Sequence, residues 1–393
     1  MERELNGSHH AARAWVTDWP DDRGSALSLT FDDGYSCHYK YLAPILNEHG
    51  LKATFFIVPG WLDNPSSTRH AARVGTWHEF RSLASSGHEI GSHSMTHAVM
   101  TRLPTGSEDL PGTLLHELAQ SKRVIEQHVP GMACTSFAYP YAISNREIER
   151  FTSRYYLAAR GIGNPYTMAA SAIIEIMDAD RKFRAAAKLP RHRPVSRFNR
   201  WYLTRRNEIM QRNKAFFQHH GRVLGIDNLA RLASSIKTRA FGRGVWSVFV
   251  LHEVIPFDQL NTTSTFSPYP LEYFEPFARW LAGQARSESV WIDTVTSIMK
   301  YLKERDTFVY RIIKEDHDTI EMQIDHGMDK ATFTFPLTID VLVPRTWKEV
   351  IISTGGSKKD TEHHETWEYQ HRVYARFKAI PAGQTVLLER SRA

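Results

Sequence analysis

The feature that most constrains the fold is an alternation of short apolar runs with stretches of helical periodicity between residues 26 and about 160. The apolar runs are ALSLTF (26–31), KATFFIV (52–58) and TSFAYP (135–140). The stretches with helical spacing of apolar side chains are residues 39–50, 76–87 and 114–129. Runs of this length are typical of buried strands, and strands that alternate with helices predict βα units around a parallel sheet.

HEIGSH (88–93) begins another predicted strand. Polar motifs stand at the ends of three of these strands. They are DDG at 32–34, HSMTH at 93–97 and YPYA at 139–142. In folds built from βα units, reactive groups gather where the strands end, at the C-terminal edge of the sheet. We therefore expect these three motifs to meet there.

His93 and His97 are four residues apart. On a helix such a pair lies on one face with its Cβ atoms about 5–6 Å apart, which suits one metal ion between two imidazoles. The alternative is a solvated surface pair, since the chain contains 20 histidines. A further βα-type strand, VWSVFVLHEVI (245–255), carries His252 near its end.

Asp32 and Asp33 form an adjacent carboxylate pair at the end of a strand. Neighbouring strand residues point in opposite directions, so the two side chains can serve two roles in one site. The plain alternative is a turn, because Asp-Gly is a common turn dipeptide. One aspartate with two histidines makes a three-ligand set that leaves metal positions open, as hydrolytic zinc sites require.

TFDDG, GHEIGSHSMTH, SFAYPYA and VFVLHEV, in this order, resemble the motifs of polysaccharide deacetylases of the NodB-homology type, carbohydrate esterase family four. The similarity covers roughly residues 26–160 and 243–306. It implies an α/β fold class, a distorted (β/α) barrel. It also implies that Asp33, His93 and His97 bind a divalent metal, Zn²⁺ in the first place and Co²⁺, Ni²⁺ or Mn²⁺ as alternatives.

The resemblance implies three further roles. Asp32 would be the general base, His252 the general acid that protonates the leaving amine, and the backbone N–H of Tyr141 a donor to the oxyanion. An amine leaves poorly unless it is protonated, and a histidine that titrates near neutrality can supply the proton. The alternative for His252 is a core histidine on an apolar strand, and for Tyr141 it is plain packing.

The chain departs from the family pattern at two motifs. The third motif usually carries an arginine that holds the base aspartate, and that position is Ala138 here. We name Arg160, in AARG, as a guess for its replacement. Ala142 stands where a glycine usually follows. The fourth motif, an Asp with a nearby Trp, has no clear counterpart, and Asp227 and Trp246 are candidate substitutes.

The pattern predicts two domains: a barrel over residues 1–307, with an insertion at about 165–230, and a β-sandwich of immunoglobulin-like size over 308–393. The second region contains short β-like runs split by polar turns, among them ATFTFP (331–336). Residues 181–222 carry thirteen Lys or Arg against one acid, a net +12 in a chain of net +6. The rest of the chain is therefore acidic overall, and the insertion is the basic part.

Three functions are consistent with these features. The leading one is a metal-dependent hydrolase that removes N-acetyl, and in a wider reading O-acetyl, groups from a polysaccharide or oligosaccharide. The alternatives are a hydrolase of non-sugar amides or cyclic imides and an inactive glycan-binding protein. The basic insertion suits an anionic glycan or an anionic membrane surface, with a solvated face or an oligomer contact as the plain reading.

The remaining expectations concern partners and compartment. No recognised nucleic-acid fold accompanies the basic segment, so nucleic acid is not an expected partner. No apolar run approaches the roughly 18 residues that span a bilayer. No leader is visible, so we expect a cytoplasmic protein by default, or an extracytoplasmic one if a leader was removed. Cys37 and Cys134 are free thiols or one bridge, and the oligomeric state is not predicted.

Overall fold

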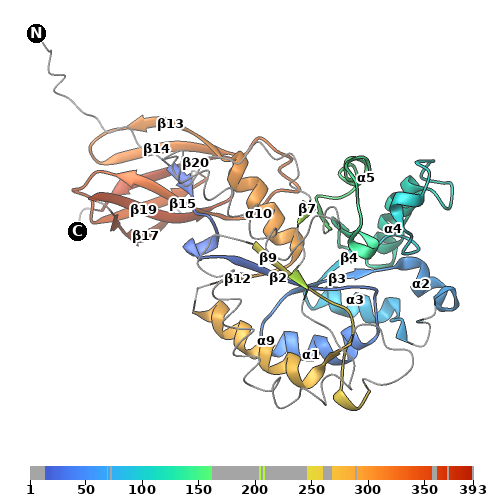
Figure 1. Ribbon diagram of the computed structural model, residues 1–393. Coiled ribbons are helices and arrows are strands. Elements are labelled where there is room, and N and C mark those ends of the chain that lie inside the picture. Colours follow the sequence, from blue (N-terminus) through green and yellow to red (C-terminus); the bar gives the residue numbers. More distant parts are fainter. Residues whose placement is uncertain are drawn as a thin grey trace, which may run out of the picture. The chain divides into compact units, whose positions relative to one another are not determined.

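The computed structural model describes most of the chain outside the basic insertion (Figure 1). The described residues are 14–68, 70, 73–161, 203–204, 207–208, 246–259, 268–287, 290–355, 361–369 and 371–391. They divide into a barrel unit, made of described residues between 23 and 299, and a sandwich unit, made of residues 14–22 and those from 300 onward.

The barrel unit is built on a nine-stranded parallel sheet with the order β7-β6-β5-β4-β3-β2-β9-β8, in which β12 also pairs with β2. Its strands are β2 (Ala26–Phe31), β3 (Ala53–Ile57), β4 (Glu89–Ser92), β5 (Ser136–Ala138), β6 (Ala158–Arg160), β7 (Leu203–Thr204), β8 (Asn207–Glu208), β9 (Trp246–Leu251) and β12 (Trp291–Ile292). The side chains of β2, β3, β4, β5, β6 and β9 are buried throughout. Burial on both faces explains why these strands read as continuous apolar runs.

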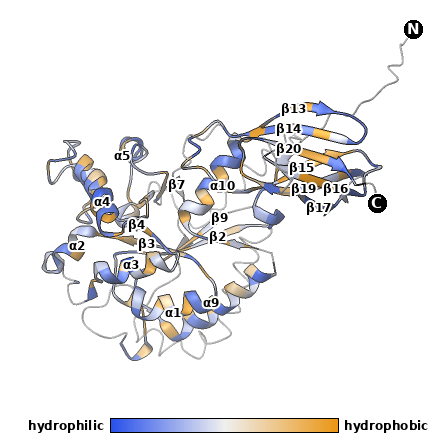
Figure 2. Cartoon of the chain, turned by 180° about the vertical axis from the view of Figure 1, so that it is seen from behind, coloured by the Kyte–Doolittle hydropathy of each residue, from blue (hydrophilic) through white to orange (hydrophobic). Residues whose placement is uncertain are grey.

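Helices connect the strands and cover the sheet. They are α1 (Ala43–Glu48), α2 (Pro59–Asp63), α3 (Trp77–Ser85), α4 (Leu114–His128), α5 (Arg146–Thr152), α9 (Leu271–Arg286) and the start of α10 (Val295–Thr307), whose residues from Lys300 onward belong to the sandwich unit. Thr76 and Glu79 form a capping box at the start of α3, which fixes where that helix begins. Hydrophobic and hydrophilic residues alternate along α9 (Figure 2), and its buried residues join the core of the barrel.

Strands β7 and β8 lie at the two ends of the sheet order, although only two residues separate them in the sequence. β7 pairs with β6 and β8 pairs with β9. One short segment therefore reaches both edges of the sheet, so the sheet must curve into a nearly closed barrel. Both strands fall inside the predicted insertion, where the sequence predicts no strand.

The sandwich unit contains two antiparallel sheets with the orders β1-β15-β19-β18 and β13-β14-β20-β16-β17. Its strands are β1 (Ala14–Val16), β13 (Val309–Glu315), β14 (Thr319–Asp325), β15 (Leu337–Val343), β16 (Glu349–Thr354), β17 (Thr361–Glu365), β18 (Trp367–Tyr369), β19 (Arg372–Ala379) and β20 (Ala382–Arg390). In β14 every second residue is buried, the pattern of a strand with one face on a core.

The predicted fold class, a distorted (β/α) barrel with a C-terminal β-sandwich, is confirmed. The predicted run at 331–336 is wrong, because it forms a turn in which the Asp329 side chain accepts the amides of Ala331 and Thr332. We assigned the N-terminal residues to the barrel, whereas β1 pairs with β15. The domain boundaries as a whole stay a prediction.

Other expectations are met in part. Cys37 and Cys134 are both free thiols. Among the helices that the structure describes, none is long and apolar enough to cross a membrane. The basic insertion at about 165–230 lies outside the described residues, apart from the two short strands β7 and β8.

Candidate metal centre

Strand β2 delivers two aspartates at its C-terminal end. The Asp32 amide donates to the Leu251 carbonyl at 3.0 Å, so Asp32 continues the pairing of β2 with β9. Asp33 then adopts a left-handed conformation with φ of 76°. Both carboxyl groups are buried. The two side chains have different partners, Arg160 for Asp32 and Tyr35 for Asp33, and their two roles stay a prediction.

His93 and His97 lie in the turn that follows β4. The His93 amide donates to the Ile57 carbonyl at 2.8 Å, and the His97 amide donates to Ser94 Oγ at 3.0 Å. Ser94 and His97 are left-handed, with φ of 65° and 61°. The helical interpretation of their spacing is therefore wrong. The turn, and not a helix face, brings the two imidazole rings to 4.8 Å between centroids.

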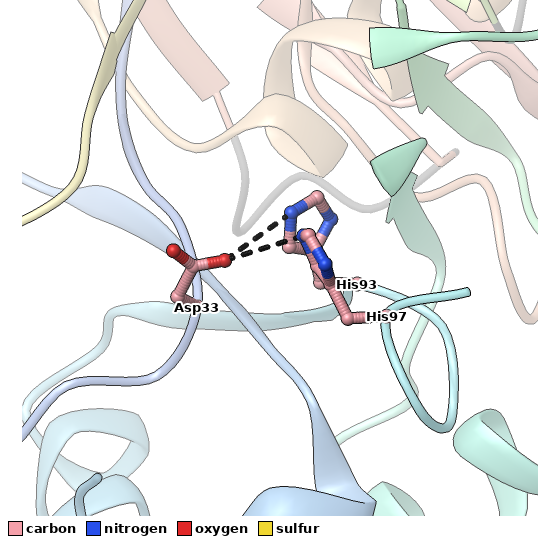
Figure 3. Close-up of side chains that lie close together, drawn as sticks. All are labelled: Asp33, His93 and His97. Atoms are coloured by element: carbon pink, nitrogen blue, oxygen red, sulfur yellow. Dashed lines mark ion pairs between the residues drawn. The ribbon is translucent and has the colours of Figure 1, made fainter. Parts of the chain in front are cut away.

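Three ligand atoms converge between these two segments (Figure 3). Asp33 Oδ1 lies 3.6 Å from His93 Nε2 and 3.5 Å from His97 Nε2. The three residues form a group that could hold a metal ion, with ligand atoms all within 4.8 Å of one another. Asp33 Oδ1 is buried and has no hydrogen-bond partner in the described part of the chain. A buried carboxylate oxygen in that state is costly unless a cation compensates it, so the site fits a metal.

Hydrogen bonding and packing prepare the two imidazoles as ligands. His93 Nδ1 lies 2.8 Å from the Ala138 carbonyl, which can only accept a hydrogen bond. Nδ1 therefore carries the proton of the neutral ring, and Nε2 keeps the lone pair that a metal needs. The His97 ring packs between Trp61, at 5.2 Å, and Tyr141, at 4.6 Å. Burial, followed by the neighbouring His93, lowers the pKa of His97 to about 2. His97 is therefore a neutral imidazole at pH 7.

The other oxygen of the Asp33 carboxylate is held by a tyrosine. The Tyr35 hydroxyl donates to Asp33 Oδ2 at 3.0 Å, and Tyr35 is itself fully buried. Burial and the charge of Asp32 raise the pKa of Asp33 to about 7, although the bond from Tyr35 acts in the opposite direction. A positive ion at Oδ1 would favour the charged carboxylate.

Asp32 is held by an arginine from the far side of the barrel. Arg160 Nη2 donates to Asp32 Oδ1 at 2.6 Å and to Oδ2 at 2.7 Å. Burial alone would raise the pKa of Asp32, but the charges of Arg160, His93 and His252 outweigh burial and hold that pKa well below its usual range. Asp32 Oδ2 also lies 3.9 Å from His93 Nε2. Asp32 is therefore an ionised carboxylate beside the ligand atoms.

His252 follows strand β9 and belongs to the same site. Its carbonyl accepts a hydrogen bond from His38 Nε2 at 2.8 Å. Burial lowers the pKa of His38 to about 4, so this ring is neutral at pH 7 and carries its proton on Nε2. His252 is half-buried, and its charge is among those that lower the pKa of Asp32.

The YPYA turn brings Tyr141 to the edge of the site. Tyr141 and Ala142 are both left-handed, with φ of 57° and 56°. This conformation explains why a glycine suits the position that Ala142 occupies. The Tyr141 side chain is 55% exposed, and its ring packs edge-on against His97.

The structure leaves out one candidate and adds two residues. Trp246 is the first residue of β9, where its indole donates to Ser28 Oγ at 3.2 Å. It therefore lies at the opposite end of that strand from His252, and its candidacy for the fourth motif is wrong. Asp227 lies outside the described residues. Tyr35 and His38 were not predicted, although both follow the DDG motif closely in the sequence.

Comparison with known proteins assigns part of the chain to a family. The family model described as "Polysaccharide deacetylase" matches residues 20–158. Residues 20–158 are a polysaccharide deacetylase domain. They contain the DDG, HSMTH and YPYA motifs, and so every residue of the Asp33, His93 and His97 cluster. The expected resemblance is confirmed.

The deacetylase domain has curated relatives of different lengths. A chitooligosaccharide deacetylase of Rhizobium leguminosarum bv. trifolii is 34% identical over 95 residues, which is 23% of this chain and 39% of that protein. A gellan lyase of a Bacillus species is 24% identical over 350 residues, which is 87% of this chain and 12% of that protein. The chain therefore spans well under half the length of these relatives.

Two solved structures also match the chain, at low sequence identity. A family-four pseudoenzyme of Bacillus anthracis is 14% identical with a TM-score of 0.38, covering 72% of this chain and 66% of that chain. A T48 deacetylase solved with substrate is 17% identical with a TM-score of 0.34, covering 69% of this chain and 88% of that chain.

Proposed function

We propose that this protein is a metal-dependent hydrolase that removes acetyl groups from a glycan. One observation carries the proposal: the buried Asp33 Oδ1 has no hydrogen-bond partner in the described part of the chain and faces Nε2 of His93 and of His97 at 3.6 and 3.5 Å. Asp33, His93 and His97 would hold the metal. One carboxylate and two imidazoles suit Zn²⁺, and Co²⁺, Ni²⁺ and Mn²⁺ accept the same ligands.

A divalent cation in this site would lower the pKa of a coordinated water and polarise the acetyl carbonyl. The ionised Asp32 would act as general base and take a proton from the attacking water. The bond between the acetyl carbon and nitrogen breaks, acetate leaves with the oxygen of the water, and His252 gives a proton to the leaving amine. For an O-acetyl ester, the leaving alcohol takes that proton instead.

The turn around Tyr141 supports a fourth role. The Tyr141 amide lies in the short turn Pro140–Ala142 that follows β5, where Tyr141 and Ala142 have left-handed backbone. That amide would donate a hydrogen bond to the negative oxygen that forms during hydrolysis. The exposed Tyr141 ring, beside His97, offers a flat apolar face of the kind on which sugar rings stack.

A glycan substrate is supported by the family of residues 20–158 and by relatives whose names point to carbohydrate polymers, chitooligosaccharide and gellan. The basic insertion at about 165–230 would favour an anionic polymer, and a contact with an anionic membrane surface is the alternative for the same charges. Both interpretations of the insertion stay predictions, because those residues lie outside the described ones.

The test is acetate release from a panel of N- and O-acetylated glycans that includes chitooligosaccharides and gellan. The protein is stripped with a chelator and reloaded with Zn²⁺. We expect release to stop on chelation, to return with Zn²⁺, and to fall about 10²–10⁴-fold in Asp32→Asn, which keeps the metal ligands. His97→Ala should lose Zn²⁺ affinity, whereas the matched control His116→Ala should keep it.

Other results would point elsewhere. Bound Zn²⁺ without acetate release from any glycan would overturn the proposal. Ring opening of a cyclic imide without acetate would then indicate a hydrolase of non-sugar amides. Glycan binding without turnover of any substrate would indicate a binding protein.

A further inference from the structure

Arg160 is a buried arginine that pairs with the carboxylate of Asp32. Its Nη2 atom lies 2.6 and 2.7 Å from the two oxygens of Asp32, and its side chain is almost fully buried. A buried guanidinium persists only when it is paired, so the position of Arg160 and that of Asp32 depend on each other. Both groups lie at the C-terminal edge of the parallel sheet, Asp32 after β2 and Arg160 as the last residue of β6.

The register of the sheet relates Arg160 to Ala138. In the parallel pairing of β5 with β6, Ala138 and Arg160 are direct partners. Partners on adjacent strands project to the same face, and neighbouring strands lie about 4.8 Å apart. Ala138 is fully buried and supplies only a methyl group to that face, while its carbonyl accepts from His93 Nδ1. An arginine at residue 160 therefore enters the barrel one strand away from residue 138.

One aromatic contact and one backbone hydrogen bond hold Arg160 in place. The Arg160 guanidinium lies 5.1 Å from the centre of the Phe56 ring on β3. That ring fills the space beside Gly91, where a Cβ atom would come within 2.6 Å of it. The Arg160 carbonyl accepts the Tyr139 amide at 3.0 Å. The Arg160 guanidinium therefore lies against the Phe56 ring where it meets Asp32.

We infer that Arg160 is the positioning residue for the general base Asp32. Residue 138 on β5 is an alanine and offers no cationic group, so Arg160 on the neighbouring strand β6 supplies that group instead. The inference rests on the proposed function of Asp32. The Arg160 guanidinium contacts the Asp32 carboxylate and the Phe56 ring, while the Arg160 backbone carbonyl contacts the YPYA turn at Tyr139. Arg160 therefore sets the direction of the Asp32 carboxylate and takes no part in the transfer of the proton.

The test compares Arg160→Met, Arg160→Lys and the relocation variant Arg160→Ala with Ala138→Arg. With Zn²⁺ bound, Arg160→Met should lower kcat for acetate release about 100-fold, with KM and Zn²⁺ affinity within about threefold of wild type. Arg160→Lys should keep more of kcat than the methionine variant. The relocation variant should recover at least about tenfold over Arg160→Ala alone, since the two Cα positions are neighbours in register.

Two results would overturn the inference. One is a kcat within about threefold of wild type in Arg160→Met. The other is loss of Zn²⁺ affinity in parallel with activity, which would make Arg160 a structural support of the metal site. If the methionine variant does not fold, the lysine and relocation variants carry the same comparison.

A second measurement separates this inference from the proposed function. If the zinc-loaded wild type releases no acetate, the proposed function fails. The pairing of Arg160 with Asp32 is then still tested by the free energies of urea unfolding of Arg160→Met, Asp32→Asn and the double variant. We expect the double variant to lose less stability than the two single changes added together. Additive losses would mean that the two side chains do not position each other.

Discussion

Tyr35 donates its hydroxyl to one oxygen of the Asp33 carboxylate at 3.0 Å and leaves the other oxygen facing His93 and His97. One carboxylate oxygen, Oδ2, thus binds a protein donor, and the other, Oδ1, is available to the proposed metal. A buried carboxylate held at one oxygen has a fixed direction, and direction is what a ligand to a metal needs.

Tyr35→Phe removes this hydroxyl and keeps the ring. We expect Zn²⁺ affinity to fall about 10–100-fold, the usual effect of losing a partner that orients a metal ligand. Competition with a chromophoric chelator measures it. The matched control is Tyr156→Phe, a buried tyrosine whose hydroxyl donates to the Leu118 carbonyl at 2.8 Å. An equal loss in both variants would contradict the assignment.

His38→Phe tests how the turn that carries His252 is held. The change removes the donor to the His252 carbonyl but keeps a ring in a fully buried position. We expect kcat for acetate release to fall about tenfold with Zn²⁺ affinity unchanged, because the proposed acid shifts while the ligands do not. His88→Phe is the control. His88 is also buried, but it precedes β4, whereas the metal ligand His93 follows that strand. Unchanged kcat in His38→Phe would count against the role of this bond.

Glu304 predicts a pH dependence of stability in the sandwich unit. Burial raises its pKa from 4.5 to about 7, and both of its oxygens accept the Phe335 amide, at 2.9 and 3.1 Å. Between these two pH values the folded state keeps a proton that the unfolded chain releases. The free energy of unfolding therefore falls as pH rises through this window, by about 2–3 kcal/mol in all.

Urea unfolding at pH 4.5 and pH 8 checks this slope. Glu304→Gln cannot ionise, so the variant should lose that part of the fall and gain on the wild type at pH 8. Glu315→Gln, at an exposed strand position, should follow the wild type. A pH dependence in Glu304→Gln equal to that of the wild type would rule out Glu304 as its source.

Ala142→Gly should stabilise the protein. Ala142 has φ of 56°, a conformation that costs a residue with a Cβ about 1–2 kcal/mol. We expect the glycine variant to unfold at higher urea, by about 1 kcal/mol, with metal affinity unchanged. The same substitution at Ala84, inside helix α3, should have the opposite sign, since glycine destabilises a helix interior. Destabilisation at both positions would show that the strain at Ala142 is negligible.

Much of the barrel could be predicted because its strands are buried on both faces and so appear as uninterrupted apolar runs. The prediction for residues 26–31 coincides with β2 (Ala26–Phe31). Strand β6 was missed, since AAR is too short and too polar to stand out, although it carries Arg160. Strand β1 was missed for a different reason: its partner β15 lies more than 300 residues away, and no local pattern reports such a pairing.

The metal triad could be predicted as a set but not as a geometry. Residue types and order indicated Asp33, His93 and His97, whereas the backbone that unites them has left-handed residues at Asp33, Ser94 and His97. Aspartate and histidine adopt this conformation more often than most residues do, but neither side chain requires it. The surrounding hydrogen bonds impose it, and they link segments that a sequence pattern treats separately.

The pairing of β1 with β15 has a consequence for how the chain is made. Ala14 pairs with Val341, so the two strands are translated with the whole deacetylase domain between them. The barrel can fold before β15 has left the ribosome. Until then the backbone groups of β1 that pair with β15 have no partner strand. The sheet that contains β1 is thus completed late, and a cell that slows translation between residues 16 and 337 prolongs the time in which this strand can pair with the wrong partner.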